Sequence, residues 1–187
     1  YVHENGAAIL ANVTLTNNKA SKWGGGAINN KGVATLESCV IRDNSAGNEG
    51  GGIYNGSKEL TLRNCTISEN SAPGGGGICC FGAVTMENTK ISGNHAGDVG
   101  GGIDAHGTLN VTGGEFSGNS GGDAGGIYIS GGAIMLTNVS IHDNWGSGGG
   151  ALNNKTGTAT LTGCTIQANS SANEGGALFV GSGSSGT

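Results

Sequence analysis

One asparagine recurs along the whole chain at a nearly constant interval. Neighbouring members of the series are separated by 24 to 26 residues, and the positions are Asn18, Asn44, Asn70, Asn94, Asn119, Asn144 and Asn169. A repeat of this length indicates one supersecondary unit stacked on copies of itself, because a single unit cannot bury its own apolar residues. The chain is therefore expected to form a solenoid, in which these asparagines stack and hydrogen-bond from coil to coil.

A glycine pair followed by Ala or Ile keeps the same interval. It occurs at 25–27, 51–53, 76–78, 101–103, 125–127, 149–151 and 175–177. Glycines repeated in this way suit a positive φ or a close approach of backbones between coils. A phosphate-binding loop is disfavoured, since it needs one glycine-rich turn that leads into a helix.

Within each repeat, short stretches alternate between apolar and polar residues, as in Val33–Glu37. Such alternation predicts short, half-buried strands. Between two of them lies a corner residue that suits left-handed geometry, namely Asn12, Ser38, Asn64, Asn88 or Asn138. Three short strands and three bends per repeat, without helical periodicity, predict an all-β fold. We expect a right-handed parallel β-helix of about seven coils.

Aligning the repeats gives columns of inward-facing residues. The first column is Leu10, Leu36, Leu62, Met86, Val111, Leu136 and Leu161, and the second is Leu15, Ile41, Ile67, Ile91, Phe116, Ile141 and Ile166. The third is assigned to Ala27, Ile53, Ile78, Ile103, Ile127, Ala151 and Ala177, and a fourth, of small residues, to Val13, Cys39, Cys65, Thr89, Gly114, Val139 and Cys164. Residues 1–180 are therefore expected to form one solenoid domain that starts partway through a repeat of a longer protein. The Gly/Ser-rich tail, residues 181–187, is linker-like.

Composition disfavours two classes of partner. The net charge is −5 and only eight Lys and Arg are present, so no basic stripe is available for nucleic acid. No run of about 18 apolar residues predicts a membrane-inserted helix. The sequence indicates no cofactor and no metal.

The repeat resembles that of the polymorphic outer membrane proteins, whose repeats carry GGA[ILV] and FxxN tetrapeptides. The matching segments here are Gly25–Ile28, Ile41–Asn44 and Phe116–Asn119. In most repeats Ile replaces the Phe, and we interpret the Ala as replaced by Ile. The resemblance implies an extracellular or cell-surface β-helix that is used in adhesion.

Polar residues with catalytic or metal-binding chemistry gather near the fourth coil. They are His95, Asp98, Asp104, His106 and Asp123. No Arg or Lys accompanies them, so we expect solvated loop residues and no catalytic site, with a carbohydrate-active enzyme as an alternative. Asp43, Glu69 and Asp143 share one bend position on different coils and are expected to be solvated turn residues.

Five cysteines leave at least one thiol unpaired within the chain. Cys39 and Cys65 fall in one column on adjacent coils, where a disulfide is possible. We favour two small buried thiols, since Val and Thr occupy the same column elsewhere. Cys79 and Cys80 are adjacent in a strand, so Cys79 is expected to point outward, as an exposed thiol or in an intermolecular bridge.

Two outward files are candidates for contact. The file beside the glycines is assigned to Ile28, Tyr54, Cys79, Asp104, Tyr128, Leu152 and Leu178, and its apolar character suggests a binding surface. The alternative is that a loop covers it. Threonines in the other file, such as Thr35, Thr61 and Thr85, leave ice binding open.

The favoured function is therefore non-enzymatic, with multivalent contacts along the faces of the solenoid. Expected partners are a host or neighbouring-cell surface molecule, a glycan or further copies of the chain. Self-assembly into end-to-end filaments is an alternative.

Overall fold

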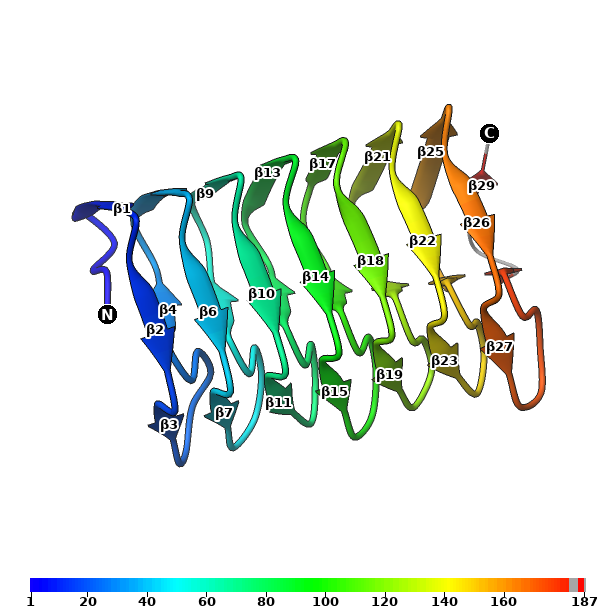
Figure 1. Ribbon diagram of the computed structural model, residues 1–187, viewed down its shortest axis with the longest axis horizontal. Coiled ribbons are helices and arrows are strands. Elements are labelled where there is room, and N and C mark those ends of the chain that lie inside the picture. Colours follow the sequence, from blue (N-terminus) through cyan, green and yellow to red (C-terminus); the bar gives the residue numbers. More distant parts are fainter. Residues whose placement is uncertain (182–184, 187) are drawn as a thin grey trace.

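The computed structural model describes residues 1–181 and 185–186, and these residues form a solenoid of stacked coils (Figure 1). Four parallel sheets run along the solenoid, and each coil contributes one strand to each sheet in turn. Among the described residues all regular structure is β-strand. No described segment forms a helix long and apolar enough to cross a membrane.

Sheet I has eight strands, which are β1 (Ala7–Ala11), β5 (Val33–Glu37), β9 (Glu59–Arg63), β13 (Ala83–Glu87), β17 (Leu109–Thr112), β21 (Ala133–Thr137), β25 (Thr158–Thr162) and β29 (Ser185–Gly186). Sheet II has seven, which are β2 (Thr14–Thr16), β6 (Val40–Arg42), β10 (Thr66–Ser68), β14 (Lys90–Ser92), β18 (Glu115–Ser117), β22 (Ser140–His142) and β26 (Thr165–Gln167). The first two inward columns predicted from the sequence lie in these sheets and are in the predicted register.

Sheet III consists of two-residue strands, which are β3 (Lys19–Ala20), β7 (Ser45–Ala46), β11 (Ser71–Ala72), β15 (His95–Ala96), β19 (Ser120–Gly121), β23 (Trp145–Gly146) and β27 (Ser170–Ser171). Sheet IV follows the glycines and contains β4 (Ile28–Asn30), β8 (Ile53–Asn55), β12 (Ile78–Cys80), β16 (Ile103–Ala105), β20 (Ile127–Ile129), β24 (Leu152–Asn154) and β28 (Leu178–Val180). The prediction of three strands per coil is therefore wrong. Sheet III occupies a stretch interpreted as a polar bend, because a two-residue strand is too short to show alternation.

The corners of each coil use left-handed backbone. The predicted corner residues between sheets I and II, such as Asn12 and Asn64, have φ of 57° and 52°. A second series of left-handed residues lies between sheets II and III and includes Asp43, Glu69 and Asp143, with φ of 53° to 56°. These three acids are exposed on different coils, as expected for solvated turn residues.

The asparagine column forms a continuous ladder beside the second corner. Both the backbone N–H and the Nδ2 of Asn70 donate to Oδ1 of Asn94, each at 3.0 Å. The same Nδ2 also donates to the carbonyl of Ile41 on the preceding coil, at 3.0 Å. Repetition of this pattern from Asn18 to Asn169 confirms the predicted ladder. Each amide therefore satisfies backbone groups that the bend would otherwise leave unpaired.

Two rows of glycine explain the approach to sheet IV. Gly25, Gly50 and Gly75 have φ of 78°, 63° and 58°. A Cβ on the next residue, as on Gly51, would lie 2.3 Å from the carbonyl oxygen of Gly76. The sequence predicted a positive φ or a close backbone approach at the glycines, and the two occur on successive residues.

The register of sheet IV corrects the third inward column. Ile28 pairs with Ile53, and Leu152 pairs with Ile127 and Leu178. Ala27 instead lies beside Gly52 and donates its N–H to that residue's carbonyl. The repeat therefore reads Gly-Gly-Ala-Ile or Gly-Gly-Ala-Leu in three coils, and in the other four coils Gly rather than Ile replaces the Ala. Ala151 and Ala177 likewise precede the inward column and do not belong to it.

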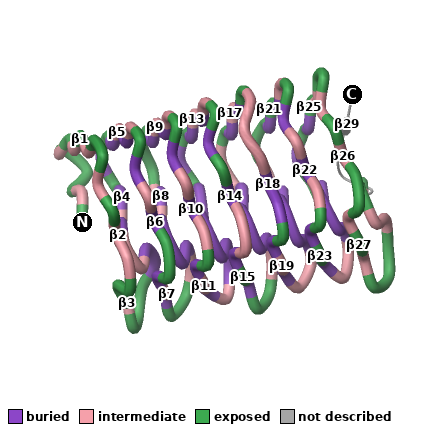
Figure 2. The backbone as a smooth tube through the Cα atoms, in the orientation of Figure 1, coloured by how far each residue is buried: buried purple, intermediate pink, exposed green. Residues whose placement is uncertain are grey.

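Burial increases toward the middle of the solenoid (Figure 2). Side chains in the central coils, such as Ile67, Ile91 and Phe116, are fully buried, whereas their equivalents Leu15 and Ile166 near the ends are only partly buried. The tail that was expected to be linker-like lies partly outside the described residues, namely at 182–184 and 187. Its Ser185–Gly186 form β29 beside β25.

Candidate functional site

The outward column of sheet IV differs from the predicted binding surface. It contains Asn29, Tyr54, Cys79, Asp104, Tyr128, Asn153 and Phe179. Tyr54, Cys79, Asp104 and Tyr128 were assigned correctly. Ile28, Leu152 and Leu178 belong to the inward column, because the alanine before each of them takes the position of a glycine and not that of an isoleucine.

The middle of this column is covered by loops. Cys79 is fully buried, and Asp104 and Tyr128 are only 3% and 5% exposed. The loops that follow sheet III pass over this column. Gly74, in one of these loops, lies so close that a Cβ added to it would be 3.4 Å from Oδ2 of Asp104. The prediction of an exposed Cys79 is therefore wrong, and the alternative of a covering loop is confirmed for these positions.

Asp104 and His106 meet beneath this cover. Oδ2 of Asp104 lies 3.1 Å from Nε2 of His106, and Nδ1 of His106 lies 2.7 Å from Oγ of Ser130 on the next coil. Phe81, from the coil before, stacks on the imidazole with ring centres 4.3 Å apart and an angle of 3°. The imidazole is therefore fixed in position by three neighbours.

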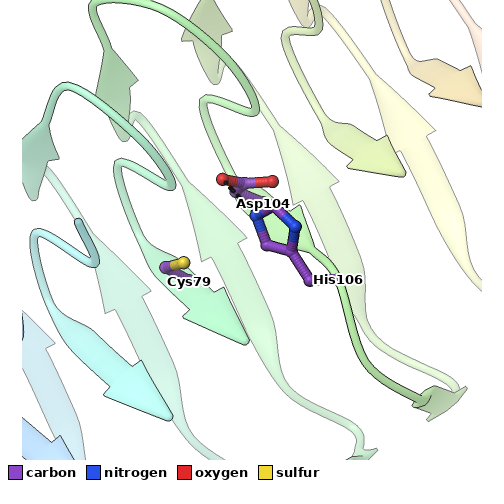
Figure 3. Close-up of side chains that lie close together, drawn as sticks. All are labelled: Cys79, Asp104 and His106. Atoms are coloured by element: carbon purple, nitrogen blue, oxygen red, sulfur yellow. Dashed lines mark hydrogen bonds and ion pairs between the residues drawn. The ribbon is translucent and has the colours of Figure 1, made fainter. Parts of the chain in front are cut away.

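Cys79 completes a cluster of possible ligands. It is paired with Asp104 across β12 and β16. Its Sγ, a carboxylate oxygen of Asp104 and a ring nitrogen of His106 all lie within 4.8 Å of one another. Figure 3 shows the three side chains on two neighbouring coils.

The electrostatics of the cluster follow from burial and charge. The hydrogen bond that Asp104 accepts raises the pKa of His106, against an opposing effect of burial. Burial raises the pKa of Glu49, which also interacts with the charges of Asp104 and His106. Burial and the charge of Asp104 raise the pKa of Cys79, so the free thiol stays protonated.

Three buried oxygens of the described residues have no hydrogen-bond partner, and all belong to this outward column. They are Oδ1 of Asn29, Asp104 and Asn153. A buried polar atom without a partner costs about 1–3 kcal/mol. The column therefore carries unused hydrogen-bonding or ligating capacity.

The column opens into hollows toward both ends of sheet IV. Near the first two coils, a cleft of about 440 Å³ is lined by Tyr1, Trp23, Gly24, Asn29, Lys31, Asn48, Glu49 and Tyr54. Near the last coils, a hollow of about 260 Å³ is lined by Asp123, Ser147, Gly148, Asn153, Lys155, Asn173, Glu174 and Phe179. Aromatic faces line the first hollow, whereas the second is mainly polar.

The other residues of the predicted cluster lie elsewhere. His95 is exposed on sheet III, where Nδ1 lies 2.9 Å from Oγ of Ser120. Asp98 lines a shallow surface hollow together with His95, and Asp123 belongs to the hollow near the last coils. Sequence reasoning missed Ser130 and Phe81, which occupy the same corner position as His106 on adjacent coils. Their common position after the strand of sheet IV, on consecutive coils, is the sequence signal that could have placed them beside His106.

All five cysteines are free. Cys39 and Cys65 are buried, and their thiols donate to the carbonyls of Glu37 and Arg63 at 3.3 and 3.2 Å. In this structure both thiols are free, and the absence of a disulfide stays a prediction.

Burial predicts the reactivity of these thiols. In the native chain we expect a water-soluble disulfide reagent to label Cys164 alone, because it is the one cysteine that is not buried. All five should react after unfolding without reductant, as mass spectrometry would report. The Cys164→Ser variant is the control and should remain unlabelled when native. Unfolded chains with only three reactive thiols would indicate a disulfide.

The architecture has a counterpart among known families. The whole chain, residues 1–187, matches the family model described as the right handed beta helix region. The chain therefore belongs to the right-handed β-helix family, which confirms the predicted fold. This family includes both polysaccharide-active enzymes and proteins without catalytic activity. No curated protein and no solved structure matched the chain in the other two comparisons.

Proposed function

We propose that this chain is a non-enzymatic β-helical module of the cell surface or the extracellular space that binds glycan chains along the outer side of sheet IV. The observation that carries this proposal is the cleft near the first two coils. Its walls combine Trp23, which is 75% exposed, and Tyr54 with the polar side chains of Asn29, Asn48 and Glu49. Aromatic faces pack against the C–H faces of sugar rings, and neighbouring polar groups bind hydroxyls.

The second hollow supports a multivalent mode of contact. Its column residues, Asn153 and Phe179, lie five coils beyond Asn29 and Tyr54 on the same sheet. At ~4.8 Å per coil the two hollows are separated by about 24 Å. One extended glycan that reaches both would bind more tightly than at either alone, because the second contact is intramolecular. The resemblance to surface-protein repeats supports the same location and mode of action.

The two tryptophans allow a direct test. Trp23 lies in the cleft, whereas Trp145 is exposed on sheet III. We expect an immobilised polysaccharide array to retain the chain. The Trp23→Ala variant should bind at least tenfold more weakly, and Trp145→Ala should bind as the parent chain does. If no glycan is retained, or if both variants lose binding equally, the proposal is wrong.

Self-assembly makes a different prediction. Electron microscopy and size-exclusion chromatography, with and without reductant, should show a monodisperse chain if the module acts as proposed. Long fibres would instead favour the end-to-end filament.

One observation favours an enzymatic alternative, namely the hydrogen-bonded series of Ser130, His106 and Asp104. A serine next to an oriented imidazole is the arrangement used for nucleophilic catalysis. It would hydrolyse ester groups on glycans. Release of carboxylic acid from an esterified glycan, abolished in Ser130→Ala and His106→Ala, would replace the non-enzymatic proposal.

A further inference from the structure

We propose that Cys79, Asp104 and His106 bind a divalent transition-metal ion, with Zn²⁺ as the best fit. Their ligand atoms, one sulfur, one oxygen and one nitrogen, already lie within 4.8 Å of one another. In a tetrahedral zinc site with Zn–S of about 2.3 Å and Zn–N of about 2.0 Å, ligand atoms are about 3.3–3.6 Å apart. Small side-chain movements would therefore close the site, since Asp104 Oδ2 and His106 Nε2 are 3.1 Å apart.

The surroundings of His106 match those of a metal ligand. Oγ of Ser130 lies 2.7 Å from Nδ1, so it can accept the N–H of that nitrogen and leave Nε2 for the ion. Metal-ligating histidines nearly always have such a partner on the other ring nitrogen. Phe81, stacked on the ring, holds the plane of the imidazole toward Asp104.

The second and independent observation is the unpaired oxygen of Asp104. This side chain is 95% buried, and Oδ1 has no hydrogen-bond partner. A buried carboxylate is costly unless it is paired or coordinates a metal. Oδ2 is paired with His106, whereas Oδ1 accepts no hydrogen bond from any residue that the structure describes. A cation bound to Cys79 and to Nε2 of His106 would replace the hydrogen bond between His106 and Asp104, neutralise the carboxylate and take one of its two oxygens as a ligand.

The donor set selects among metals. Thiolate and imidazole favour zinc and its transition-metal neighbours, whereas Ca²⁺ and Mg²⁺ prefer sites of oxygen alone. Binding displaces the proton of the Cys79 thiol, which passes to solvent as the metal–sulfur bond forms. Glu49 interacts with the charges of both Asp104 and His106 but lies outside the three-residue cluster, so we expect water to supply the fourth ligand. The side chain of His106 is 31% exposed and leaves a path for entry.

Cobalt provides the first test, because it needs no variant. The full chain is reduced, stripped with a chelator and titrated with Co²⁺. We expect one ion per chain and a near-ultraviolet absorption band from charge transfer between Cys79 and cobalt. Zn²⁺ should abolish the band by displacing cobalt and should raise the melting temperature of the chain. Absence of the sulfur–cobalt band from the folded chain would overturn the proposal.

Matched variants locate the site. Cys79→Ala, Asp104→Asn and His106→Gln should each lower Zn²⁺ affinity at least 100-fold in a competition assay with a chromogenic chelator. Ser130→Ala should lower it about 10–100-fold, as expected for loss of a partner that orients a ligand. The controls are Cys164→Ser and His95→Gln, which lie outside the cluster and should bind zinc as the parent does. Unchanged affinity in folded Cys79→Ala would place the ion elsewhere and contradict the proposal.

Discussion

Replacing Asn94 by alanine should destabilise the folded chain by about 3–5 kcal/mol, although the substitution removes only one side chain. Its Oδ1 accepts two hydrogen bonds from Asn70, and its Nδ2 donates to the carbonyl of Ile67 and to Oδ1 of Asn119. Alanine would leave the N–H of Asn70 buried without a partner, at about 1–3 kcal/mol, would remove the two hydrogen bonds that the Nδ2 donates, and would add a small cavity.

The control for this prediction is Asn18→Ala. Asn18 is exposed at the first rung, and Oδ1 of Asn44 would keep the backbone N–H of residue 18 as a donor. We expect a cost below about 1 kcal/mol, because water can replace the lost amide. Urea unfolding followed by circular dichroism compares the two variants. Equal losses in both would show that the ladder adds little beyond intrinsic turn preference.

The second large effect is expected at Gly101, where even a methyl group should prevent the native packing. A Cβ there would lie 2.3 Å from the carbonyl oxygen of Ser120 and 2.6 Å from that of Gly125. Both atoms are backbone of the next coil, so relief requires the coils to separate. We expect Gly101→Ala to lose more than about 3 kcal/mol or to fail to fold.

Gly97→Ala is a matched control in the same coil. A Cβ at Gly97 would meet its nearest atom, Cα of Pro73, at 3.8 Å, which is ordinary van der Waals contact. This variant should stay within about 1 kcal/mol of the parent, and it can be stabilised because alanine restricts the unfolded chain. Thermal unfolding measures both. A Gly101→Ala chain as stable as Gly97→Ala would contradict the close approach.

The double change Gly51→Val and Gly52→Val should likewise abolish folding.

Much of this fold could be predicted because each coil repeats the same physical requirement. The ladder from Asn18 to Asn169 and the apolar columns of sheets I and II follow from spacing alone. The register of sheet IV could not be assigned as safely, since Ala27 and Gly52 are both small and the strand after them has three residues. A one-residue slip there exchanges the inward and outward faces. Ile28 was consequently placed on the wrong face.

The candidate site was only partly predictable for a different reason. Asp104 stands out as the one charged residue in its column, and His106 is its neighbour in sequence. Cys79 and Ser130 lie on the coils before and after, so their contacts depend on the stacking register. The cover over Cys79 is set by loops near Gly74 and Val99, whose course no periodic pattern describes.

The parallel ladder also determines how the molecule would respond to mechanical load. Hydrogen bonds between coils, including those of the asparagines, run along the solenoid axis, so a pull along that axis loads the coils in series. Terminal coils are the least buried and should detach first. Each released coil of about 25 residues can extend to roughly 80–90 Å. Under tension the chain would therefore lengthen in large discrete steps from its ends, while the central coils around Asp104 remained folded longest.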